Sequence, residues 1–89
     1  MRDPLDLWLQ RLRDPEPATR RQAIRQLELI GDPRALGALA HLFALDPDLE
    51  IRKLAQSVGK AIYQAAERRQ AHQRPAQPAD NPDKGRAGL

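Results

Sequence analysis

The chain turns at residues 30–36, Ile-Gly-Asp-Pro-Arg-Ala-Leu, where one helical pattern ends and another begins. Gly31 has no Cβ, so it can adopt the left-handed conformation that ends many helices. Asp32 can accept a backbone N–H as the N-cap of the next helix, and Pro33 suits a first helical position, where a missing donor is not needed. A joint this short predicts two antiparallel helices that contact each other.

Asp-Pro steps punctuate the rest of the chain in the same way, and a helical pattern follows each of them. The other three steps are Asp3-Pro4, Asp14-Pro15 and Asp46-Pro47. Aliphatic residues then recur every three or four positions, which is typical of helices with one buried face. The patterns predict four helices, over residues 3–13, 17–30, from the joint to about 44, and from 48 to between 69 and 73.

Charge and periodicity change along the chain, and this predicts how it is organised. The third helix carries almost no charge, so we expect it to be the most buried element. Apolar periodicity ends near Ala71, and proline, glycine and polar residues follow. Such a composition cannot bury enough surface to offset its ordering entropy. We therefore expect a helical domain over residues 1–74 and a disordered tail over 75–89.

The composition excludes several classes of protein. The chain has 89 residues, no cysteine and only one Trp, one Tyr and one Phe, which predicts one small domain with an aliphatic core. A cysteine-free chain suits a reducing compartment, and neither a membrane span nor a secretory signal is expected, so we predict a cytoplasmic protein. The net charge of +3 is spread over 15 basic and 12 acidic residues, without the concentrated positive field of a strong nucleic-acid binder.

An internal repeat appears when the chain is superposed on itself with a shift of 32 residues. Asp14-Pro15 then coincides with Asp46-Pro47, Ala23 with Ala55 and Ile30 with Ile62. A period of this length filled by paired helices is typical of an α-solenoid. The two copies also differ, because Leu27 coincides with Gly59 and no second Gly-Asp-Pro joint follows Ile62.

The repeat resembles a known family. Residues 19–23 (Thr-Arg-Arg-Gln-Ala), the joint at 30–36, and residues 51–55 (Ile-Arg-Lys-Leu-Ala) are similar to HEAT-like repeats of the variety named after phycobilisome lyases. The resemblance covers about residues 14–62 and implies an all-α fold, a short α-solenoid of four antiparallel helices. Residues 3–13 would be the second helix of a truncated preceding repeat. The family includes adaptors, subunits of assemblies, chromophore lyases and some nucleic-acid enzymes.

The resemblance also implies one structural interaction. In such repeats an Asp of the joint lies near the Arg that begins the next repeat's first helix, so we expect Asp32 to pair with Arg52. Together with Gly31 and Pro33, these residues are the predicted structural set.

No arrangement of residues indicates catalysis, a cofactor or a metal site. His41 and His72 lie far apart in sequence without Cys or acidic partners at ligand spacing. Ser57 has no nucleophile-elbow context. The acidic residues at 46–50 suit the start of a helix, where the dipole favours negative charge. We therefore expect a protein that is not an enzyme.

A protein-interaction role is the favoured interpretation, because about three repeats are normally needed for a stable solenoid and this chain has fewer. The partner is then a second copy or a larger complex, and the function is that of a small adaptor or accessory subunit. Large hydrophobic residues off the core stripes and a basic ridge on the second and fourth helices are the candidate surfaces. The expected contact residues are Arg21, Arg25, Lys53, Lys60, Leu7 and Tyr63.

The basic ridge (Arg21, Arg25, Lys53 and Lys60) also supports an alternative function, binding of nucleic acid or phosphate. Against this alternative, acidic residues are interleaved with the ridge, as on an ordinary solvated helix face. Strong dependence of binding on salt concentration would distinguish the two interpretations.

Overall fold

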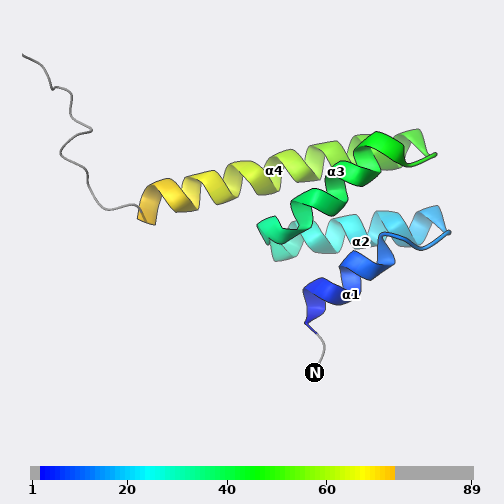
Figure 1. Cartoon of the computed structure of the whole chain (residues 1–89), viewed down its shortest axis with the longest axis horizontal. Helices are drawn as coiled ribbons and strands as arrows, with labels where there is room; N and C mark the ends of the chain where they lie inside the picture. The colour runs from blue at the N-terminus through cyan, green and yellow to red at the C-terminus, as the bar shows by residue number, and fades with distance from the viewer. Residues whose placement is uncertain (1–2, 74–89) are drawn as a thin grey trace, which may run out of the picture.

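The computed structural model describes residues 3–73, and within that range it contains four α-helices, a 3₁₀ turn and no strand (Figure 1). The expected tail at 75–89 lies outside the described residues. The all-α, HEAT-like solenoid predicted from the sequence is confirmed. The elements are α1 (Pro4–Arg11), α2 (Pro17–Ile30), the 3₁₀ turn η1 (Pro33–Ala35), α3 (Leu36–Leu45) and α4 (Leu49–Gln73).

The helix ends are formed by the residues that the sequence indicates. The Asp3 carboxylate accepts a hydrogen bond from the Leu5 N–H at 2.9 Å, which caps α1. Gly31 has a φ of 70°, the left-handed conformation, and its N–H donates to the carbonyl oxygen of Leu27 at 2.9 Å. The Asp32 carboxylate accepts from the Arg34 N–H at 2.8 Å and begins η1. The joint is therefore built as predicted.

The helices form two layers. Figure 1 shows α2 and α4 running alongside each other, with α1 and α3 crossing the same side of that pair. The most extensive contacts of α3 are with α4, while α2 packs against α4 and α1. The joint reverses the chain direction as predicted, but α3 leaves the end of α2 at an angle, so its main contacts are with α4 rather than with α2.

The core is aliphatic and lies between the layers. Its largest fully buried side chains are Ile24, Leu27, Leu39, Ile51 and Val58. The expectation that α3 is the most buried element is wrong. Although α3 is apolar around most of its circumference, only one side is covered.

Exposed residues mark the uncovered sides of these helices. On α3, Phe43 is 46% exposed and Leu45 is 66% exposed. At the end of α2, Ile30 is 40% exposed although it follows buried Leu27 by three residues, at helical spacing. Helical periodicity therefore identified apolar faces correctly but overestimated how much of each face is covered.

Two glycine substitutions test the left-handed cap. Replacing Gly31 by Ala places a Cβ on a residue with positive φ, which we expect to lower the free energy of unfolding by about 1–2 kcal/mol. Gly37 is the matched control, because it lies within α3 and has open space around its missing Cβ. Gly37→Ala should leave stability unchanged or raise it by up to about 1 kcal/mol. Urea denaturation measures both, and equal effects of the two substitutions would contradict the assigned role of Gly31.

Candidate functional site

A buried ion pair joins α2 to the end of α3. Nε and Nη2 of Arg20 donate to the two carboxylate oxygens of Asp46 at 2.8 and 3.1 Å, and both side chains are nearly inaccessible to solvent. Nη1 of Arg20 donates to the carbonyl oxygens of Asp14 and Pro15 at 2.8 and 3.0 Å. All three guanidinium nitrogens are therefore hydrogen-bonded, as a buried charge requires.

Part of this hydrogen-bond pattern recurs 32 residues later, so the internal repeat extends to individual contacts. Nη1 of Arg20 donates to the Asp14 carbonyl, and Nη1 of Arg52 donates to the Asp46 carbonyl at 2.6 Å. Each Asp also caps the turn that follows it. The Asp14 carboxylate accepts from the Glu16 N–H at 2.9 Å, and the Asp46 carboxylate accepts from the Asp48 N–H at 2.8 Å.

The pair expected between Asp32 and Arg52 is replaced by two other interactions. The Asp32 carboxylate accepts from Nε and Nη2 of Arg34, with a shortest distance of 2.8 Å. Arg52 binds the carbonyl oxygen of Asp46 instead. Asp32 is satisfied by a neighbour two residues away, whereas the Asp that pairs with an Arg of a first helix is Asp46, at the far end of α3.

An apolar groove of about 360 Å³ lies between α3 and α4. Its α3 wall contains Leu36, Ala40 and Phe43, and its α4 wall contains Gly59 and Tyr63. Phe43 and Tyr63 are both about half exposed. The groove is therefore the place where the uncovered side of α3 meets α4.

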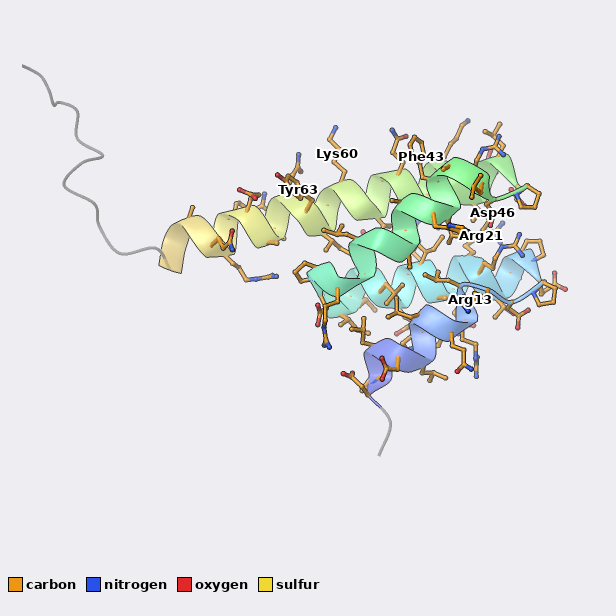
Figure 2. All side chains as sticks on the ribbon, viewed as in Figure 1. Arg13, Arg21, Phe43, Asp46, Lys60 and Tyr63 are labelled. Carbon is orange, nitrogen blue, oxygen red and sulfur yellow. The ribbon has the colours of Figure 1, made fainter. Side chains whose placement is uncertain are left out.

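The predicted contact residues are distributed over more than one surface. Lys60 and Tyr63 line the groove together and project from the edge of α4 that faces away from α2 (Figure 2). Arg21 and Arg25 are exposed on α2, where Arg25 donates to the Glu28 carboxylate at 3.1 Å. Leu7 is half-buried in α1, so it offers less surface than its off-stripe position suggested.

Lys53 is exposed on α4, one residue from Arg52.

Phe43 and the Arg20–Asp46 pair are absent from the predicted site, although the sequence contains a signal for each. The near absence of charge in α3 predicts a buried helix, and this prediction leaves Phe43 out of the candidate contact surface. Arg20 and Arg52 coincide in the repeat, and Asp14 coincides with Asp46, which points to one kind of bond in both copies.

Within residues 3–73 no group of three or more His, Cys, Asp or Glu residues could hold a metal ion, and no helix is long and apolar enough to cross a membrane. His41 is exposed on α3. The described residues thus present a packed helical array with an apolar groove and charged edges.

Helical pairs that stack with a fixed repeat length are typical of an α-solenoid. Residues 1–70 match the family of HEAT repeats, and the chain belongs to that family. HEAT repeats commonly serve as protein-interaction modules and are generally non-catalytic. No curated protein and no solved structure matches the chain. The narrower resemblance to the phycobilisome-lyase variety stays a prediction.

A double-mutant cycle tests which Asp and Arg are coupled. Arg20→Ala or Asp46→Ala should each lower the free energy of unfolding by about 3–5 kcal/mol, because each leaves a buried charge without its partner. The double variant should lose much less than the sum of the two. The corresponding cycle on Asp32 and Arg52 should give a coupling energy near zero.

The exposed pair Arg25–Glu28 provides the control for this experiment. Its side chains are 60% and 40% exposed, so its coupling energy should be about 0.5 kcal/mol or less. Urea denaturation gives all the values. A coupling between Arg20 and Asp46 as small as that of the control pair would contradict the structural role of the buried bridge.

The joint carries a carboxylate with a perturbed pKa. Hydrogen bonds from the Arg34 side chain, and then from its backbone N–H, lower the pKa of Asp32 below its ordinary value of 3.8. Any stability that Asp32 contributes is therefore present above about pH 3.8 and is lost as the pH falls through the lower, folded-state value. In an NMR titration, Arg34→Ala should raise the pKa of Asp32, whereas Arg69→Ala, which removes a weaker influence, should raise it less.

Proposed function

We propose that this chain is a non-catalytic protein–protein interaction module, a small adaptor or accessory subunit of a larger assembly. The groove between α3 and α4 is its main contact surface. A cytoplasmic location is part of the same proposal and is supported by the cysteine-free composition.

The uncovered side of α3 is the observation that carries this proposal. A helix that is apolar around most of its circumference is normally enclosed by neighbours. Here Phe43 and Leu45 are exposed, and Phe43 lies with Tyr63 along one apolar groove. Exposed aromatic residues beside a groove are typical of the anchor positions of protein interfaces, and Lys60 would lie at the polar rim.

The basic ridge supports the nucleic-acid alternative less well. Arg25 is paired with Glu28, and Lys60 belongs to the groove rather than to a surface shared with Arg21 (Figure 2). Single cations separated in this way do not form the continuous positive surface that a phosphate backbone requires.

Affinity capture with groove variants tests the proposed function. The full chain, carrying a tag, should retain a partner from its native lysate, and the double substitution Phe43→Ser with Tyr63→Ser should abolish that retention, because it removes both aromatic anchors. Leu29→Ser is the matched control, since Leu29 is 79% exposed but does not line the groove.

Circular dichroism should show equal helix content in all these variants. Retention that is equal in the wild-type chain and the groove variant would contradict the assigned surface. A chain that retains no partner at any concentration used would contradict the interaction function itself.

A further inference from the structure

Equivalent positions of α2 and α4 differ in how deeply they are buried. Arg20, Ile24 and Leu27 lie on one side of α2 and are 8%, 0% and 0% exposed. Their equivalents 32 residues later are Arg52, Gln56 and Gly59, which are half-buried or exposed. We call these three residues the open face of α4. The equivalent side of α2 is the side that packs against α4 and the end of α3.

A neighbouring side of α2 shows the converse difference. Ile51, Val58 and Ile62 are buried in α4. Their equivalents in α2 are Thr19, Gln26 and Ile30, which are half-buried or exposed and form the open face of α2. The described residues therefore end in two different surfaces, and each corresponds to a surface that is buried elsewhere in the same chain.

The two ends also contain complementary halves of the buried bridge. Arg52 has its bond to the Asp46 carbonyl, as Arg20 has to the Asp14 carbonyl, but within residues 3–73 no carboxylate pairs with it. Asp14 caps its turn as Asp46 does, but no described cation pairs with its carboxylate. Among the described residues, Arg52 at one end therefore has no Asp partner, and Asp14 at the other end has no Arg partner.

We propose that the groove and the open face of α4 bind the α1 end of a second copy of this chain, with Arg52 of one copy donating to the Asp14 carboxylate of the next. This inference rests on the proposed function, whose partner it names. The helix that leads into Asp14 is α1, as α3 leads into Asp46. The second copy's α1 would therefore lie in the groove, beside Phe43 and Tyr63.

The directions of the helices agree with this arrangement. In Figure 1 the last residues of α1 and α3 lie at the same end of the molecule as the first residues of α2 and α4. If a second copy is translated along the stack without rotation, its Asp14 therefore lies beside Arg52 at the start of α4 of the first copy. Exposed Ile30, which belongs to the open face of α2, supplies apolar surface on the arriving copy.

This contact is heterologous, because it joins two different surfaces of the same chain. Each copy that binds leaves its own open face on α4 for another, so association should continue beyond a dimer as concentration rises. The pair between Arg52 and Asp14 of the next copy would fix the register of this contact, since an Arg–carboxylate pair has two parallel hydrogen bonds and a defined geometry.

Sedimentation velocity over a series of concentrations tests the proposal on the full chain. The wild-type chain should associate, and Arg52→Ala should weaken association at least about thirtyfold, because it leaves an Asp carboxylate without a partner in the interface. Arg52→Lys keeps the charge but not the paired hydrogen bonds, so it should also weaken association. Asp14→Asn keeps an oxygen for the Glu16 N–H and should weaken association comparably.

A mixture of two variants distinguishes this contact from a symmetric one. Arg52→Ala retains an intact Asp14, and Asp14→Asn retains an intact Arg52. Mixing them should therefore restore one functional contact and give a one-to-one dimer that grows no further. Leu29→Ser is the control, because Leu29 is exposed on α2, outside both open faces, and this variant should associate like the wild-type chain.

Three results would overturn the proposal: a wild-type chain that stays monomeric throughout, variants that associate as strongly as the wild type, or a mixture that forms no dimer. Circular dichroism confirms that each variant is folded, and Arg52→Lys replaces Arg52→Ala if the latter is not. A monomeric chain that still retains a different protein through the groove would overturn head-to-tail stacking and leave the interaction function standing.

Discussion

The bridge between Arg20 and Asp46 is the contact on which the arrangement of the helices depends. A buried guanidinium must have its hydrogen bonds satisfied, and here the acceptors come from the turn before α2 and from the end of α3. Asp46 also caps the turn that leads into α4, and its carbonyl oxygen accepts from Arg52. A single residue therefore connects three helices, and this fixes their relative register more narrowly than aliphatic packing alone would.

Local features of the fold could be predicted from the sequence because they depend on neighbouring residues. The left-handed Gly31, the cap provided by Asp32 and the ends of α2 require only contacts within a few positions. The family resemblance correctly implies a contact between an Asp and an Arg, but it pairs Asp32 with Arg52, whereas Asp32 pairs with Arg34 and Arg20 pairs with Asp46. Arg34 lies two residues away, and its side chain donates the hydrogen bonds to the Asp32 carboxylate that the prediction assigned to Arg52.

The candidate site was harder to predict because periodicity shows which residues are apolar and not which of them are covered. The pattern in α3 is equally consistent with enclosure on all sides and with a surface that awaits a partner. Only the arrangement in space, with α4 on one side of α3 and solvent beside Phe43, distinguishes the two. The sequence predicts Lys60 and Tyr63 as contact residues, but the groove that they line together with Phe43 arises only from the packing of two helices.

The two copies of the repeat differ at Gly31, where α2 ends but the equivalent part of α4 continues as a helix. Gly31 coincides with Tyr63, which lacks the conformational freedom of glycine, and α4 continues to Gln73 instead of turning. Between Tyr63 and Ala71 no residue is buried, and the hydrogen bond from Arg69 to the Gly31 carbonyl oxygen is long and exposed, so this part of the helix is held mainly by its continuity with the anchored turns before it. Its amides can therefore open, and a protease can cut there, without breaking a buried contact of the stack.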